Sequence, residues 1–320
     1  MDTSLAQNFL RMTAALLLWL LAIPAASAMP AIQHWVTDNG VRVYFVEAPE
    51  LPMVDINVTF AAGGVRDDGH AGLAHMTSTL LDMGAAGLSA DEISSRAESL
   101  GAELGTGSAR DMAWITLRSL SDAAHLQPAL KLLADVINRP DFNKKDFERE
   151  RERTQVAIRR SEQSPATVAE YTFFQSSYGE HPYAPRPGGT VESIAALKLD
   201  QIKAFYKQYY VARNAVFSIV GDLDRKAAEQ LVEQVTGQLP AGKRAAAVAP
   251  VPVLTSAQEQ RIYHPSTQTH VRMGAPGMHR GDPDYFALYV GNHVLGGGGL
   301  VSRLFEDCLL YTSPSPRDHG

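Results

Sequence analysis

The sequence predicts an α+β protein, built from layers of mainly antiparallel sheet packed by helices. Short alternating runs rich in β-branched residues lie among longer segments with helical spacing, and the two kinds do not alternate strictly. The 320-residue chain is 45% apolar and 20% charged, which are proportions of a globular protein. An order of strand, turn, acidic loop and helix occurs early and recurs late, which indicates a tandem duplication with an incomplete second copy.

The first half of the chain shows three strand patterns and several helix patterns. Residues 41–47 (VRVYFVE) alternate after an Asn39-Gly40 turn signal, and strands are also expected at 54–61 and 112–117. Helical spacing spans 72–83 and 89–100, and the second of these begins with a capping box of Ser89 and Glu92. Further helices are expected at 121–138, 144–162, 164–178, 199–210 and 225–239, with a strand at 215–220.

The domain boundaries follow from composition. Residues 29–239 form the first predicted domain, and the Ala/Pro-rich, unpatterned residues 240–257 are predicted to be a linker. Residues 258–307 then repeat the early order, with a strand expected at 269–275 and a helix at 285–295. The glycine run 296–299 is expected to open a further helix, but it lacks the Lys-Ser/Thr end of a phosphate loop.

The N-terminal residues 1–28 have the pattern of a secretory signal peptide. Arg11 precedes an apolar run over 14–23, and the small residues Ala26-Ser27-Ala28 predict cleavage near Ala28. The protein is therefore expected to be secreted or periplasmic, and retention of the segment as an uncleaved anchor is the alternative.

The C-terminal residues 308–320 contain CLLYTSPSPRD, which resembles the translation of a sequencing adapter and is predicted to be non-native. Without Cys308 the chain has no cysteine, so no disulfide is expected despite the export signal. The net charge of -6 and the absence of a Lys/Arg block argue against nucleic-acid binding.

Several motifs in the chain occur together in one known family. They are GLAHMTST (72–79), FAAGGVRDD, FERERERTQVAI, HPYAPRPGGTVESI, FYKQYYVARNAVFSIVGDLD and GGGGLVSRLFED. In this order and near this spacing they resemble the pitrilysin/insulinase (M16) metallopeptidase family, over essentially the whole natural chain. The resemblance implies that family's fold and, in its intact members, zinc.

The resemblance also implies that the zinc site of this chain is broken. Intact members carry His-x-x-Glu-His on one helix face and a Glu ligand from a later helix. Here His75 is kept, Ser78 stands at the general-base position, and Thr79 stands at the second ligand position. The later stretch places Ala157 at the third ligand position, although a slip of several residues would bring in Glu152 or Glu162.

Each replacement removes a chemical capability. A serine hydroxyl is too weak a base at neutral pH, threonine is a poor zinc ligand, and an alanine methyl has no lone pair. No cofactor is therefore expected in this chain, and His75 is interpreted as a leftover, satisfied histidine in a packed helix. The alternative is a metal site rebuilt around His75. Its candidate ligands are His70, Asp67, Asp68 and Asp82.

The glycine-rich region 101–111 resembles the family's edge strand, where substrate pairs by strand addition. The substrate-binding candidates in this region are Gly105, Thr106, Gly107, Ser108 and Ala109. An ordinary Gly-rich hairpin is an equally good interpretation. The Glu/Arg run 148–153 is interpreted as a solvated helix face with i,i+4 ion pairs.

Together these observations predict a non-catalytic subunit of an exported M16-type zinc endopeptidase pair. Its expected partner is a zinc-bearing M16 chain, and the pair would enclose and hold a peptide substrate. The alternatives are an active metallopeptidase with a rebuilt metal site, and a structural or scaffold relative.

Overall fold

The computed structural model describes residues 31–307, and its centre is a six-stranded sheet with the order β1-β2-β8-β3-β7-β6. Every neighbouring pair of strands is antiparallel except β2 and β8, which are parallel. The strands are β1 (Gln33–Val36), β2 (Arg42–Glu47), β3 (Met53–Phe60), β6 (Glu103–Ser108), β7 (Ala113–Leu120) and β8 (Ala215–Gly221). The predicted α+β class with a mainly antiparallel sheet is confirmed.

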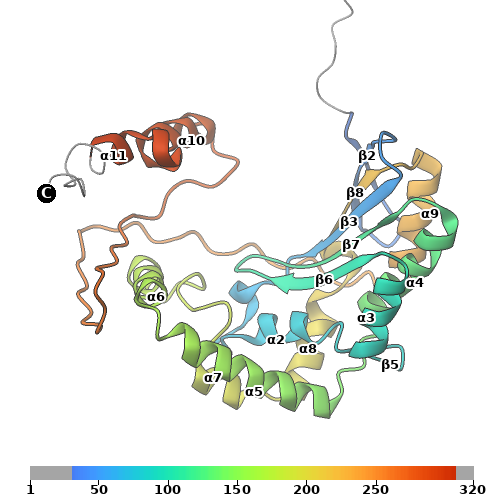
Figure 1. The fold of residues 1–320 in the computed structure, drawn as a ribbon, viewed down its shortest axis with the longest axis horizontal. Helices are drawn as coiled ribbons and strands as arrows, with labels where there is room; N and C mark the ends of the chain where they lie inside the picture. The colour runs from blue at the N-terminus through green and yellow to red at the C-terminus, as the bar shows by residue number, and fades with distance from the viewer. Residues whose placement is uncertain (1–30, 308–320) are drawn as a thin grey trace, which may run out of the picture.

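The core lies on one face of this sheet. Alternate side chains of β3, from Val54 to Phe60, are buried, as the period of two in a half-buried strand requires. Helices cover that face (Figure 1). The opposite face carries outward side chains such as Tyr44 and Arg118. The helices of the first layer are α2 (Leu73–Thr79), α3 (Ala90–Ser99), α4 (Ala123–Asn138), α8 (Leu199–Tyr209) and α9 (Arg225–Thr236).

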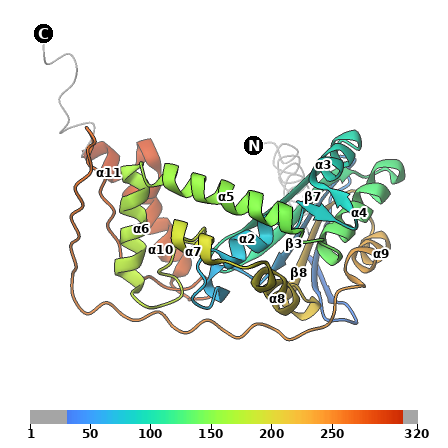
Figure 2. The same ribbon diagram turned by 90° about the horizontal axis from the view of Figure 1, so that it is seen from below.

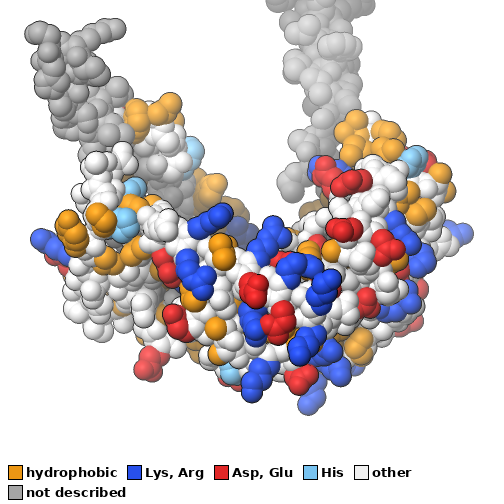
Figure 3. Space-filling model, turned by 60° about the horizontal axis from the view of Figure 1, so that its bottom comes forward, with side chains coloured by type: hydrophobic (Ala, Val, Ile, Leu, Met, Phe, Trp, Pro, Cys, Tyr) orange, Lys and Arg blue, Asp and Glu red, His pale blue; other side chains and the backbone are white. Residues whose placement is uncertain are grey.

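A long helix, α5 (Lys144–Ser161), lies outside this layer next to α2, and α6 (Pro165–Tyr178) follows it at an angle (Figure 2). The outer surface around α5 carries interspersed acidic and basic side chains (Figure 3). Both helices begin within one residue of their predicted starts, and the Ser89–Glu92 capping box is present at α3. The sequence patterns missed β1, the short α7 (Val191–Ala196) and the two-residue strands β4 (Gly84–Ala85) and β5 (Leu88–Ser89).

The predicted strand at 269–275 is wrong, because the chain there has no regular structure. Val271 and Met273 are 73% and 95% exposed, so the alternating pattern has no core to face. The expected helix at 285–295 is present as α10 (Tyr285–Asn292), which continues into a π-helical turn over His293–Gly297. The glycine run does not open a helix either: a 3-10 turn covers Gly299–Val301, and α11 (Arg303–Phe305) begins later.

Residues 240–257 have no regular secondary structure, yet their first part is held against the sheet domain. The Arg66 guanidinium donates to the Ala246 carbonyl at 2.6 Å, and a ring nitrogen of His181 lies 2.9 Å from the Ala249 carbonyl oxygen. The predicted domain boundaries themselves stay predictions. No helix within residues 31–307 is long and apolar enough to cross a membrane. The predicted signal peptide and the predicted non-native tail lie outside the described residues.

Candidate functional site

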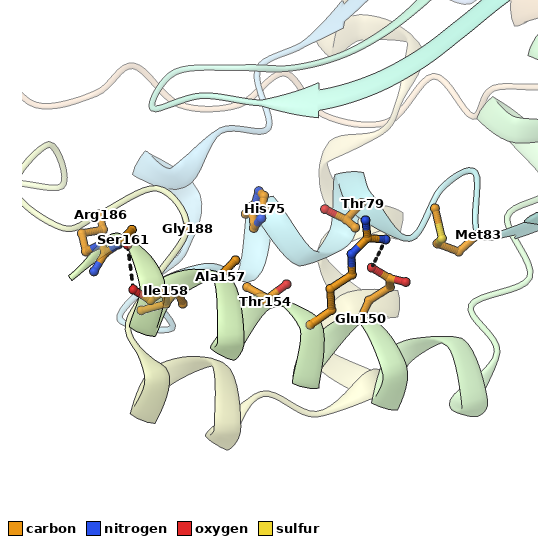
Figure 4. Close-up of a pocket in the computed structure, with 11 residues that line it drawn as sticks. His75, Thr79, Met83, Glu150, Thr154, Ala157, Ile158, Ser161, Arg186 and Gly188 are labelled. Atoms are coloured by element: carbon orange, nitrogen blue, oxygen red, sulfur yellow. Dashed lines mark hydrogen bonds and ion pairs between the residues drawn. The ribbon is translucent and has the colours of Figure 1, made fainter. Parts of the chain in front are cut away.

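A cavity of about 480 Å³ opens between α2, α5 and the loop that carries Arg186 and Gly188. Figure 4 shows its lining, to which α2 contributes His75 and Thr79 and α5 contributes Ala157. The family resemblance placed these same three residues at the metal-ligand positions. The structure therefore brings together, around one cavity, residues from two helices that are distant in sequence.

The start of α2 is fixed by a buried carboxylate. Asp67 accepts backbone N–H bonds from Gly72 at 2.7 Å and from Ala74 at 2.8 Å, which satisfies free donors of the first turn. Burial raises the pKa of Asp67 to about 7, although the backbone hydrogen bonds act to lower it. Gly72 adopts φ +95°, and a Cβ there would approach Ile194 Cδ1 to 2.5 Å, so this turn requires glycine.

The helix aims two side chains at the cavity and turns a third away. His75 and Thr79 are one turn apart on the half-buried face of α2, so both reach the cavity. The Ser78 side chain is buried, and its hydroxyl donates to the His75 carbonyl at 2.9 Å. Ser78 is therefore tied to its own helix and does not line the cavity.

His75 lies in a packed helix as expected, but its ring is not satisfied by hydrogen bonding within the described residues. The ring lines an open cavity, and burial is the cause that lowers its pKa. The lowered pKa keeps the imidazole neutral at pH 7. The ring is thus available to a ligand as a donor or an acceptor, which corrects the interpretation of a satisfied histidine.

One face of α5 forms the opposite wall. Its cavity residues recur at helical intervals: Glu150, Arg153, Thr154, Ala157, Ile158 and Ser161. The Ala157 side chain is exposed to the cavity and leaves space where a longer side chain would reach toward α2. The possible alignment slips to Glu152 or Glu162 gain no support, because neither residue lines this cavity.

The residues present do not fit a zinc ion. Catalytic zinc sites use three protein ligands, and this lining offers only two side chains of that kind, His75 and Glu150. The Glu150 carboxylate is paired with Arg149, and the other two ligand positions hold an alcohol and a methyl group. Across residues 31–307 no group of three or more His, Cys, Asp or Glu side chains is arranged to hold a metal. The rebuilt site around His75 therefore gains no support from the described part of the chain.

The candidate ligands of that rebuilt site have other positions. Asp67 caps α2, and His70 Nε2 lies 3.2 Å from the Gln201 side-chain nitrogen. Asp82 lines a separate groove, where Thr106 donates to it at 3.5 Å and burial raises its pKa to about 6. Asp68 lies in the loop before α2 at φ 46°.

The region compared with a substrate-binding edge strand is indeed an edge of the sheet. Strand β6 is the last in the order, and its residues from Glu103 to Ser108 pair with β7 on one side only. Ala109 closes the hairpin by donating to the Met112 carbonyl at 2.7 Å. Gly107 has a structural reason to be glycine, since a Cβ there would lie 2.6 Å from the Trp114 ring.

The sequence patterns missed the charged residues of the cavity. Glu150 and Arg153 belong to the Glu/Arg run that was interpreted as a solvated face, but Glu150 is only 3% exposed. The ion pairs of this run join residues three apart, or the adjacent Arg149 and Glu150, and none of them joins residues four apart. Arg153 stands four residues before Ala157, and that helical spacing was the available signal that both line one site.

Comparison with known proteins decides the family. The family model described as "Insulinase (Peptidase family M16)" matches residues 42–185, and "Peptidase M16 inactive domain" matches residues 196–312. A solved structure, described as a peptidase M16 inactive domain from Pseudomonas fluorescens, is 35% identical. It has a TM-score of 0.80, over 88% of this chain and 68% of that one. This chain belongs to peptidase family M16.

Curated M16 relatives include proteins described with and without peptidase function. The "Uncharacterized zinc protease YmxG" of Bacillus subtilis is 24% identical over 86% of this chain and 66% of its own length. The "Non-peptidase homolog YmxG" of Helicobacter pylori is 26% identical over 85% of this chain and 62% of its own. This M16 chain spans 61% to 66% of the length of the first curated relatives.

Proposed function

We propose that this M16 chain is the non-catalytic subunit of an exported zinc endopeptidase pair, in which it helps to enclose and hold peptides. The observation that carries the proposal is the cavity between α2 and α5, where one imidazole faces an alcohol and a methyl group. The general-base position supplies no base to this cavity, since the Ser78 hydroxyl donates its hydrogen bond to the backbone of its own helix. The fold of a metallopeptidase is kept, and its donor set is absent from this cavity.

The open edge of β6 supports the peptide-holding part of the proposal. An extended peptide can add to such an edge through main-chain hydrogen bonds, which tolerate many sequences. The edge runs beside α2, and Thr106 contacts Asp82 just beyond that helix, so a peptide on β6 would pass close to the cavity. Of the predicted residues, those from Gly105 to Ser108 would provide that edge, whereas the N–H and the carbonyl of Ala109 are already bonded to Met112 and Gly64.

The partner is proposed from the family. Helicobacter pylori has both a relative described as "Zinc protease PqqE" and one described as a non-peptidase homolog, each 26% identical to this chain. Two such chains in one organism are what a division of labour between subunits requires. Export follows from the predicted signal peptide and is part of the proposal.

The test is to purify this chain alone and together with an intact His-x-x-Glu-His relative from the same source. We expect substoichiometric zinc and no peptide hydrolysis for this chain alone, and chelator-sensitive hydrolysis for the mixture that exceeds that of the relative alone. Stoichiometric zinc with hydrolysis by the single chain would establish the active-peptidase alternative. Copurification with a membrane assembly without peptidase activity would favour the scaffold alternative.

Peptide holding is tested separately by binding. A short labelled peptide and its backbone N-methylated copy differ only in main-chain hydrogen bonding. We expect the methylated copy to bind this chain, or the pair, several-fold more weakly, because strand addition uses main-chain N–H groups. Equal binding of the two would argue against the β6 edge.

A further inference from the structure

The cavity between α2 and α5 contains positive charge that the remains of a zinc site do not explain. Its lining includes two guanidinium groups, those of Arg153 and Arg186, and one carboxylate, that of Glu150. The His75 ring and the Thr79 hydroxyl add further polar groups. Glu162, just outside the lining, pairs with Arg186, and Arg149 pairs with Glu150, so the positive charge left for a ligand is that of Arg153.

The Arg153 guanidinium is held near the cavity without being satisfied there. Its Nη1 forms a long ion pair with a Glu150 oxygen at 3.7 Å, beyond hydrogen-bond distance, and its side chain is 78% exposed. Glu150 has a better partner in Arg149, whose Nε donates to its other oxygen at 3.1 Å. Arg153 thus keeps its hydrogen-bonding capacity for a ligand.

Arg186 closes the other end of the cavity in a fixed position. It donates to Glu162 at 3.1 Å and to the Ser161 hydroxyl at 2.8 Å, and its guanidinium lies 3.7 Å from the Tyr171 ring centre. Its Nε is buried without a hydrogen-bond partner among the described residues. A buried donor of this kind is costly unless a ligand or water reaches it.

We propose that this cavity binds a carboxylate of the held peptide, with Arg153 as the main contact and with His75 and Thr79 as further polar partners. Arginine suits this role because its planar fork matches the two oxygens of a carboxylate. Glu150 faces the same space and would repel the ligand, but its charge is already paired with Arg149. The guanidinium supplies positive charge where an intact member holds its metal.

This inference rests on the proposed peptide-holding function and names the preferred ligand. The carboxylate has two possible sources, an acidic side chain within the peptide or the peptide's C-terminus. Both sources present the same group to Arg153. They differ in how the peptide must lie along β6, so the experiment separates them.

The test uses two libraries of short labelled peptides that are identical except for one central Glu or Gln, each made with a free and with an amidated C-terminus. We expect one change, Glu to Gln or free to amidated, to weaken binding roughly tenfold, as for loss of a charge-assisted hydrogen bond. Arg153→Gln should remove that discrimination and leave the weaker-binding library unchanged. Arg160→Gln is the matched control, since Arg160 is an exposed arginine of α5 outside the cavity.

The outcomes separate this inference from the proposed function. If the peptides bind but the four libraries are equal, or Arg153→Gln weakens all of them alike, the carboxylate site is refuted while peptide holding stands. If binding is detected for none of the libraries, both proposals fail. Thermal unfolding of each variant checks that the fold is kept.

Discussion

Restoring the two lost ligands tests directly whether α2 and α5 still place a metal site. In the double variant Thr79→His/Ala157→Glu, the imidazole of His75 and the one introduced at position 79 lie four residues apart on one helix face, a rise of about 6 Å that suits two zinc ligands. The third ligand comes from a position that already faces the cavity and is exposed. We expect this variant to bind one zinc ion.

The expected gain in stability on zinc binding follows from the linkage between binding and folding. Zinc at a hundred times its Kd stabilises the folded state by about 2.7 kcal/mol, which corresponds to a Tm increase of about 5–10 °C for a domain of this size. The substitutions themselves should cost little, because Ala157 is exposed and Ala→Glu in a helix costs less than about 1 kcal/mol.

The assay is differential scanning fluorimetry with and without zinc, supported by metal analysis of dialysed protein. Wild type and Thr79→His alone serve as controls and should show little response. The double variant should remain inactive as a peptidase, because Ser78 still occupies the base position. A folded double variant whose Tm does not change with zinc, and which retains no zinc after dialysis, would show that the cavity does not have the inferred geometry.

Two further predictions concern the surroundings of the cavity. Gly107→Ala should cost about 1–3 kcal/mol of unfolding free energy in urea, because its Cβ would lie 2.6 Å from the Trp114 ring, whereas Gly188→Ala, with nothing within 4 Å, should be nearly neutral. Equal losses would refute the packing argument. Burial raises the pKa of Asp67 from 3.8 to about 7, so its ionisation destabilises the fold as pH rises across that interval. Wild type should therefore lose stability relative to Asp67→Asn between these pH values, and a constant difference in urea titrations would contradict the shift.

Much of the fold could be predicted because its signals are local. The capping box at α3 and the length of α5 depend on residues close in sequence. The end of α2 could not be predicted in this way. The helical spacing continued to Met83, but the helix ends at Thr79 and the chain turns into the short strand pair of β4 and β5. That strand pair consists of two-residue strands, which leave no periodic signal in the sequence.

Pairing between distant strands was also beyond the sequence patterns. Strand β8 lies between β2 and β3 in the sheet but far from both in the chain, and its parallel pairing with β2 leaves no local signature. The same limit explains the wrong strand at 269–275. An alternating pattern indicates which side chains could be buried. The segment forms a strand only where a partner strand and a core are available to it.

The chemistry of the site was predictable where it depended on residue type and hidden where it depended on geometry. The sequence identified His75, Thr79 and Ala157 by resemblance, and the structure places them around one cavity. Arg153 was overlooked because a charge run on a helix is usually solvated, and only the position of α5 against α2 shows which of its faces is the wall.

Two differences from an intact zinc site, the methyl group at the third-ligand position and the guanidinium on the same wall, both disfavour a bound cation. Loss of the ligands alone would leave neutral and acidic groups, and one carboxylate, that of Glu150, does remain in the lining. The same wall also carries an exposed guanidinium, that of Arg153, four residues before Ala157. A fixed positive charge opposes binding of a second cation and attracts an anion. The position of Arg153 beside Ala157 is therefore the arrangement that the proposed binding of a peptide carboxylate requires.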